Sequence, residues 1–262
     1  MRKIREKVQI NIPFTMLHDS YLELFLEERF NPEIGFDAES LHRFSLEEFR
    51  QVAEQCREQG LRVTFHAPFV DLSPGSPDPD VWRLTRRRYE QVVDLIPLFR
   101  PRTMVCHAGF ERKRYGYLQD VWLEKSLKMW RWLGKRVYEE GTQLMLENVF
   151  EESPNELQQL FKSLDGEKVG FCLDIGHQSA FSSTPLETWI DFLGDSIGQL
   201  HLHDNRGNED DHIALGRGTI DFRRFFHVLR KAVAGPPVVT LEPHRKEEVW
   251  PSLEFLAEEW PW

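Results

Sequence analysis

Histidine and carboxylate side chains are concentrated in residues 198–221, where the chain reads GQLHLHDNRGNEDDHIALGRGTID. His201 and His203 end a short apolar alternation, and Asp210 and His212 follow after a polar loop. Neutral imidazole nitrogens and anionic carboxylate oxygens are the donors that bind divalent metal ions such as zinc or manganese. A solvated loop with incidental histidines would give the same pattern, so this stretch alone leaves two interpretations open.

The elements that would position these side chains alternate along the chain. Short apolar runs typical of strands lie at residues 8–14, 33–36, 61–65, 103–106, 143–146, 169–173, 199–202 and 237–241. Helical spacing separates most of them, at residues 45–59, 81–98, 122–140, 153–161, 184–193 and 222–233. Ser45 with Glu48, and Ser153 with Glu156, predict capping boxes at two helix starts.

Strands that alternate with helices predict parallel pairing, because consecutive parallel strands need a crossover. Eight such units within 262 residues predict a (β/α)8 TIM barrel of the α/β class. No glycine-rich phosphate motif follows the first strand, which argues against a nucleotide-binding fold. We expect a single domain over residues 1–262, since no linker divides the chain.

In a barrel of this type the active site lies at the carboxyl ends of the strands. A metal-binding residue type stands at the end of six consecutive predicted strands: His66, His107, Glu147, Asp174, His201 and Glu242. Each residue alone could be a hydrogen-bonded core residue or a helix cap. Together they indicate a metalloenzyme, because buried carboxylates at one rim are costly unless a cation offsets their charge.

The motifs HAPF, CHAG, LENVF, CLDIGH, HLHDN, DDHIALGRGTID and LEPH, in this order, resemble the xylose isomerase-like TIM-barrel superfamily. That superfamily contains sugar isomerases and epimerases, and also the endonuclease IV family of apurinic-site nucleases. The resemblance covers most of the chain and is weakest over the first two strands. It implies one to three divalent ions, as zinc, manganese or magnesium.

The resemblance also implies ligand sets. In the ketose epimerases a single ion would be held by Glu147, Asp174, His201 and Glu242. The nuclease branch holds three zinc ions and would use five further ligands: His66, His107, His177, Asp210 and His212. Glu147 would then bridge two ions, and His203 stays unassigned.

Two activities follow from the resemblance. A metal-dependent isomerase or epimerase would act on a sugar, sugar phosphate or related polyhydroxy carbonyl compound, and Glu147 and Glu242 would pass a proton through a metal-stabilised enediolate. His177 could hold a substrate hydroxyl, while Arg114, Arg206 and Arg217 could orient the substrate or its phosphate. The alternative is an endonuclease IV-like zinc-dependent phosphodiesterase.

The net charge of the chain favours a small-molecule substrate over a nucleic acid. The chain carries 33 Lys and Arg against 43 Asp and Glu, a formal net charge of −10, and the metal-binding loop reads NRGNEDD. Both features disfavour a nucleic acid. Moreover, the chain has IGH after Asp174 where the nucleases commonly have TCH, and HLHD where they have HLND. A basic loop at Arg112 to Arg114 could still bind a phosphate.

A third possibility is a scaffold protein with a remnant metal site, whose aromatic C-terminal residues Trp250, Trp260 and Trp262 would either contact a partner or pack on the barrel. The three cysteines are widely spaced and predict reduced core residues. The sequence shows no signal peptide and no apolar run of membrane length, which predicts a cytoplasmic protein without a membrane partner. Neither the identity of the sugar nor the oligomeric state follows from the sequence.

Overall fold

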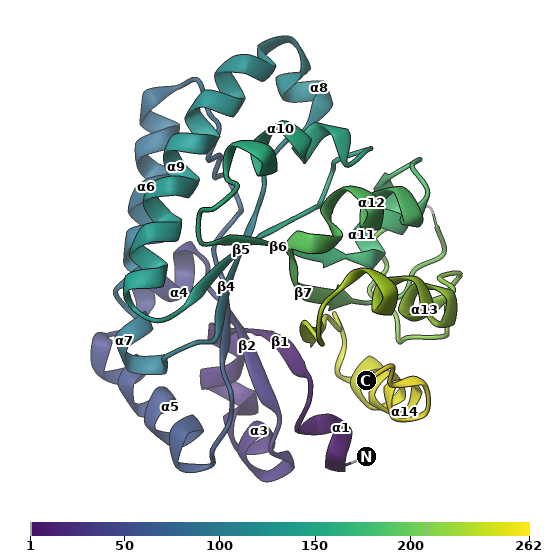
Figure 1. The fold of residues 1–262 in the computed structure, drawn as a ribbon. Helices are drawn as coiled ribbons and strands as arrows, with labels where there is room; N and C mark the ends of the chain where they lie inside the picture. Colours follow the sequence, from purple (N-terminus) through teal and green to yellow (C-terminus); the bar gives the residue numbers. More distant parts are fainter. Residues whose placement is uncertain (1, 208) are drawn as a thin grey trace.

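The computed structural model describes residues 2–207 and 209–262 and forms a closed barrel of eight parallel strands in chain order (Figure 1). The strands are β1 (Gln9–Pro13), β2 (Asn31–Gly35), β3 (Thr64–His66), β4 (Thr103–His107), β5 (Gln143–Glu147), β6 (Val169–Asp174), β7 (Ile197–Leu202) and β8 (Val238–Leu241). β8 pairs with β1 and closes the barrel. The predicted (β/α)8 fold and each of its predicted strands are confirmed.

Helices lie outside the strands and cover them (Figure 1). They are α1 (Arg2–Arg5), α2 (Phe14–Met16), α3 (Leu22–Glu28), α4 (Ala38–Arg43), α5 (Leu46–Glu58), α6 (Pro79–Val93), α7 (Ile96–Phe99), α8 (Arg112–Tyr115), α9 (Gln119–Glu139), α10 (Asn155–Ser163), α11 (Ile175–Phe181), α12 (Leu186–Leu193), α13 (Phe222–Ala232) and α14 (Val249–Glu259). The single helix predicted over residues 81–98 is wrong. Pro97 has no backbone N–H and its ring clashes with the carbonyl four residues earlier, so the chain divides into α6 and α7.

The first turns of α5 and α10 show whether the two predicted capping boxes form. At α5 the box is confirmed, because the Ser45 hydroxyl accepts from the Glu48 amide and the Glu48 carboxylate accepts from the Ser45 amide at 2.7 Å. The box predicted at Ser153 is wrong. The Glu156 carboxylate accepts from the Glu152 amide at 2.8 Å and from Arg112 Nε at 2.7 Å, and α10 begins without a side-chain cap. Arg112 lies on the short helix α8 rather than in the loop that we expected.

Successive side chains of a strand point to opposite faces, so every second residue faces into the barrel. One apolar layer consists of Val105, Met145 and Cys172, all buried and packed together. Two residues further along the same strands stand His107, Glu147 and Asp174. The ligand-type residues therefore form the layer that ends the barrel interior at the carboxyl ends of the strands.

A second part of the interior is polar. Glu33 of β2 is fully buried, and its carboxylate accepts hydrogen bonds from Thr64 Oγ1 at 2.8 Å, Gln199 Nε2 at 2.5 Å and Thr240 Oγ1 at 3.0 Å. Gln199 in turn accepts from Thr103 Oγ1 at 2.6 Å. Each polar group thus finds a partner, and the network links β2, β3, β4, β7 and β8 beneath the ligand layer.

The two ends of the chain lie on the same side of the barrel (Figure 1). Lys7 Nζ donates to the Trp262 carbonyl at 3.3 Å and lies 4.9 Å from the centre of the Trp260 ring. Trp260 and Trp262 also pack against the hydrophobic core. Trp260 and Trp262 therefore pack on the barrel, as one of the two alternatives predicted, whereas Trp250 is 37% exposed.

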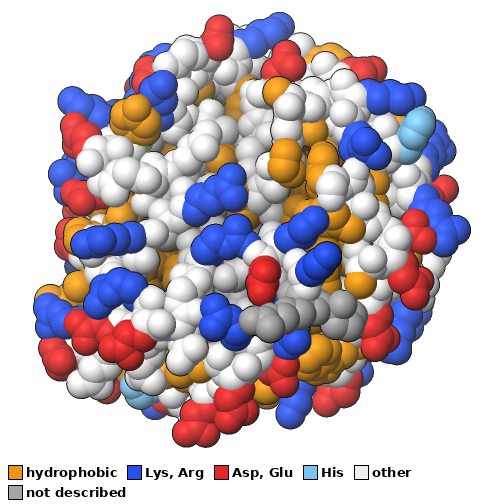
Figure 2. All heavy atoms as spheres, turned by 60° about the horizontal axis from the view of Figure 1, so that its bottom comes forward, with side chains coloured by type: hydrophobic (Ala, Val, Ile, Leu, Met, Phe, Trp, Pro, Cys, Tyr) orange, Lys and Arg blue, Asp and Glu red, His pale blue; other side chains and the backbone are white. Residues whose placement is uncertain are grey.

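Charge is unevenly distributed over the surface. On the face in Figure 2, Lys and Arg side chains gather near the middle beside hydrophobic side chains, and Asp and Glu lie mostly toward the edge. The excess of acidic residues therefore does not make every face negative. In the described part of the chain, no helix combines the length and apolar character that a membrane span requires.

Candidate metal centre

Metal-binding side chains gather in four overlapping groups at the carboxyl ends of the strands, and within each group the ligand atoms lie within 4.8 Å of one another. One group, His66, His201 and Glu242, shares all its residues with two of the other three, which are described here as clusters. The central cluster consists of Glu147, Asp174, His201 and Glu242. The β3–β5 cluster consists of His66, His107 and Glu147. The loop cluster consists of His177, His203, Asp210 and His212. The structure thus brings together all nine residues that the sequence suggested as ligands, with His203 added.

In the central cluster two carboxylates meet one imidazole. His201 Nδ1 lies 3.1 Å from Glu147 Oε1 and 2.9 Å from Glu242 Oε1. Asp174 Oδ2 is 4.0 Å from the same nitrogen. On the other edge of the ring, His201 Nε2 lies 2.9 Å from Glu33 Oε1. An Nε2–H that donates to Glu33 leaves the Nδ1 lone pair facing the carboxylates, which is the arrangement that holds a metal-binding histidine in place.

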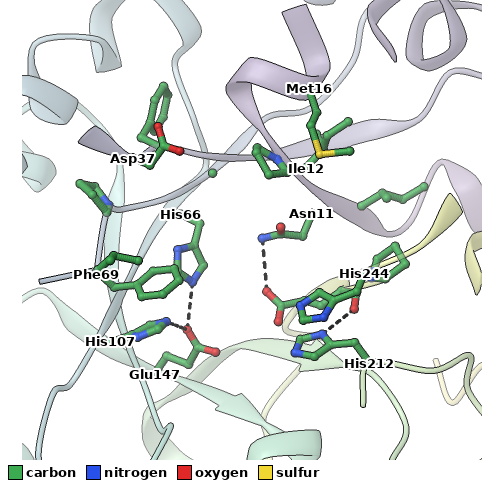
Figure 3. Close-up of a pocket in the computed structure, with 18 of the residues that line it drawn as sticks. Asn11, Ile12, Met16, Asp37, His66, Phe69, His107, Glu147, His212 and His244 are labelled. Atoms are coloured by element: carbon green, nitrogen blue, oxygen red, sulfur yellow. Dashed lines mark hydrogen bonds and ion pairs between the residues drawn. The ribbon is translucent and has the colours of Figure 1, made fainter. Parts of the chain in front are cut away.

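In the β3–β5 cluster, two histidines face one oxygen of Glu147. His66 Nε2 lies 3.2 Å and His107 Nε2 3.5 Å from Glu147 Oε2, and Figure 3 shows both rings pointing toward this carboxylate. His66 Nδ1 donates to the Ala67 carbonyl at 3.0 Å, so its Nε2 carries the lone pair. The ring of Phe69 stacks on His107 with centroids 4.2 Å apart.

The loop cluster surrounds Asp210. His177 Nε2 lies 3.4 Å and His212 Nε2 3.1 Å from Asp210 Oδ2. Backbone carbonyls accept from the opposite nitrogens of both rings: His177 Nδ1 donates to Asn148 at 3.0 Å, and His212 Nδ1 donates to Glu242 at 2.7 Å. Both Nε2 atoms therefore face Asp210, where a cation would replace their protons.

His203, which the sequence left unassigned, packs flat against His212 with ring centroids 3.7 Å apart and an interplanar angle of 8°. Lone pairs of stacked rings lie in parallel planes, so His203 and His212 cannot both point at one ion in this arrangement. Gly176 makes room for the stack, because a Cβ there would lie 2.0 Å from His203 Cε1. The glycine and the histidine that depart from the nuclease pattern are thus in contact. On its other face His212 stacks on His244 at 3.6 Å.

The protonation states suit a cation. Burial acts to raise the pKa of Glu147, but the imidazoles of His201 and His107 hold it well below its usual value. Burial likewise opposes ionisation of Glu242, and His201 outweighs it, so this pKa is also lowered. Burial lowers the pKa of His107 to about 3. Burial acts to lower the pKa of His201, but the anionic groups around it, including Glu242 and Glu147, hold this pKa well above its usual value. Without a metal the proton on His201 therefore offsets the carboxylate charge, and a divalent cation would take the place of that proton.

Unpartnered atoms provide a direct test of whether a divalent cation fits. Asp174 Oδ2 and Asp210 Oδ1 are buried and have no hydrogen-bond partner among the described residues. Buried carboxylate oxygens without partners cost free energy, which a cation between them would offset. The residues present therefore fit a divalent metal ion.

A cavity of about 870 Å³ opens onto the clusters. Glu147, His177 and Glu242 line it, so a ligand in the cavity would reach the central cluster. Asn11, which the sequence did not single out, also lines it, and its Nδ2 donates to Glu242 Oε1 at 3.2 Å and to Glu33 Oε1 at 3.3 Å. Asn11 and Glu33 lie in apolar strand runs, and the only signal in the sequence was a polar residue within each run.

The three arginines suggested for substrate binding lie elsewhere. Arg114, Arg206 and Arg217 are not among the described residues that line the cavity. Arg206 pairs with Asp211 at 3.1 Å, Arg217 approaches Glu248 at 3.5 Å, and the Arg114 guanidinium lies 5.1 Å from the Tyr115 ring centre. Substrate contact by these residues stays a prediction.

Related proteins share the fold. An uncharacterized protein of Methanocaldococcus jannaschii is 25% identical over 86% of this chain and 81% of its own. A probable endonuclease 4 of Symbiobacterium thermophilum is 26% identical over 76% and 78%. Among solved structures, a D-tagatose 3-epimerase-like protein superposes with a TM-score of 0.82 at 22% identity, over 97% of both chains. A Thermus thermophilus protein soaked with ZnCl2 gives 0.78 at 25% identity, over 96% and 97%.

A family model matches far more than half of the chain. Residues 29–259 match the model described as xylose isomerase-like TIM barrel. This span begins before β2 and reaches the end of α14, so it includes each residue of the three clusters. The chain therefore belongs to the xylose isomerase-like TIM-barrel family.

Proposed function

We propose that this protein is a metal-dependent isomerase or epimerase of a sugar or related polyhydroxy carbonyl compound. The observation that carries the proposal is the pair of buried carboxylates, Glu147 and Glu242, which approach the same His201 nitrogen at 3.1 and 2.9 Å and also line the cavity. Solved sugar epimerases with the same fold support it, including a D-psicose 3-epimerase determined with D-fructose.

Glu147, Asp174, His201 and Glu242 would hold the cation. A divalent cation bound there would polarise a substrate carbonyl and so acidify the neighbouring C–H bond. One of Glu147 and Glu242, as the carboxylate, would take the proton from that carbon. The other, protonated when the substrate binds, would return a proton, so that the two groups exchange protonation states in one turnover. Return to the same carbon from the other face gives an epimer, and return to the adjacent carbon gives an isomer. Asn11 holds Glu242 in place through its hydrogen bond.

The nuclease alternative rests on a specific observation as well. The β3–β5 and loop clusters add histidines to the central cluster, and a relative carries the name probable endonuclease 4. The acidic residues Asp210 and Asp211 beside the cavity argue against a polyanionic substrate. We therefore place phosphodiester cleavage second.

The test is conversion of a panel of ketoses and aldoses by metal-loaded protein in D2O, with deuterium uptake next to the carbonyl followed by NMR. We expect conversion by the native chain and none by Glu147→Gln or Glu242→Gln. Glu187→Gln, on the surface helix α12, is the matched control and should retain full activity. Cleavage of DNA with an abasic site, without sugar conversion, would establish the nuclease instead.

A further inference from the structure

The entrance to the cavity is apolar. Within the described surface, most of the large apolar side chains that are exposed line this one cavity: Met16, Phe69, Val70, Phe150 and Trp250. Their exposed fractions run from 37% for Trp250 to 67% for Val70. They come from segments after β1, β3, β5 and β8, so the apolar surface surrounds the carboxyl end of the barrel.

Apolar groups also reach the metal-binding residues. Figure 3 shows Ile12 and Met16 across the cavity from Glu147, and Phe69 beside His66 and His107. Phe150 extends this surface through its contact with Phe181, with ring centroids 5.3 Å apart. A ligand whose polar end lies on the carboxylates would therefore place its other end against hydrophobic side chains.

The volume of the cavity also favours a ligand that is larger than a monosaccharide. Clefts that enclose drug-sized ligands measure about 300–1,000 Å³, and this cavity of about 870 Å³ lies near the upper end of that range. A single monosaccharide would leave much of the apolar surface in contact with water. Surface of this kind is typical of binding sites for apolar groups.

The cavity offers few free cationic side chains that could bind a phosphate group. Arg88 lines the cavity, but it is buried and its Nη1 already donates to Gln91 at 2.9 Å and contacts His42 at 3.0 Å. The other cations that line the cavity, Arg245 and Lys246, are exposed at its rim. A phosphate deep in the cavity would meet carboxylates rather than free guanidinium groups.

We propose that the substrate is a polyhydroxy carbonyl compound that carries an apolar substituent, such as the aryl or alkyl group of a glycoside, and that Met16, Phe69, Phe150 and Trp250 bind this substituent. The inference rests on the proposed function of the same site. The sugar part lies on the central cluster, and the substituent displaces water from the apolar wall, which contributes binding free energy in proportion to the area covered.

Binding of unreactive glycosides tests this proposal without turnover. The probes are methyl, butyl, octyl and phenyl glycosides of one hexose, titrated by calorimetry into protein loaded with Mn²⁺ or Zn²⁺. We expect the dissociation constant to fall on the order of tenfold from methyl to phenyl. Phe69→Ser and Phe150→Ser should remove that preference, whereas Phe192→Ser, an exposed phenylalanine of α12 outside the cavity, should keep it.

Equal affinities for all four glycosides would overturn the inference, as would tighter binding of a hexose phosphate that depends on Arg245 and Lys246. A dimer that dissociates on Phe69→Ser, with no glycoside preference, would assign the apolar surface to a second copy of the chain. The outcomes separate the two proposals. A phenyl preference without sugar conversion refutes the proposed reaction alone, and conversion without the preference refutes the inference alone.

Discussion

Glu33→Gln changes the contact that holds His201 and also removes the Oε1 acceptor of the Asn11 amide. The Gln199 Nε2 and the hydroxyls of Thr64 and Thr240 donate to Oε2 of Glu33, whereas His201 Nε2 lies 2.9 Å from Oε1. In the amide variant the oxygen should remain with the three donors, so the NH2 group faces His201. Nε2 must then accept a hydrogen bond, and the ring proton moves to Nδ1, the atom that would bind the cation.

Loss of such a supporting carboxylate lowers metal affinity about 10–100-fold, which is about 1.4–2.7 kcal/mol. The assay is the dissociation constant for Zn²⁺, measured by competition with a chromophoric chelator. Thr64→Val is the matched control, since it removes one hydrogen bond to Glu33 and leaves the His201 contact. Unchanged zinc affinity in a folded Glu33→Gln variant would refute the reasoning. A Glu33→Gln variant that loses thermal stability but keeps its zinc affinity would also refute it. In that variant the amide NH2 would face the three donors, and the amide oxygen would still accept from His201.

Three further predictions follow from the site. Glu147→Ala and Glu242→Ala should each abolish turnover while circular dichroism shows an intact fold; near-normal activity in either would contradict the proton-transfer roles. Chelation should lower the melting temperature, because a ligand at 100 times its dissociation constant stabilises by about 2.7 kcal/mol; an unchanged value would argue against a bound ion. Burial raises the pKa of Glu151 from 4.5 to about 7. The folded state therefore holds a proton that the unfolded state loses, and the native chain should lose up to about 3 kcal/mol relative to Glu151→Gln between pH 4.5 and 7 in urea unfolding.

Periodicity predicted the barrel because each strand run was apolar and each helix had one buried face. It failed where one residue overrides the pattern, as Pro97 divides a helix, and at α10, which begins after Pro154 rather than at the predicted cap Ser153. The ligand-type residues were detectable because they stand directly at the strand ends. Glu33 and Asn11 were missed, because a sequence does not show that a polar residue within an apolar strand faces the barrel interior.

The apolar wall of the cavity was also beyond prediction from the sequence. Met16, Phe69 and Phe150 belong to loops far apart in the chain, and each alone resembles an ordinary exposed hydrophobic residue. Only closure of the barrel brings them to one cavity. Arg206 and Arg217 were selected because they are close in sequence to the metal-binding loop. In the structure both pair with acidic side chains instead.

The order of the strands has a consequence for assembly of the site. The central cluster takes one residue from each of β5, β6 and β7, and its fourth, Glu242, directly follows β8, the last strand to be synthesised. β8 also closes the barrel by pairing with β1. A nascent chain that ends before β8 has neither a closed barrel nor a complete set of ligands. Cation binding at this cluster would therefore be coupled to completion of the fold, so that high-affinity loading would favour closed molecules over partly made ones.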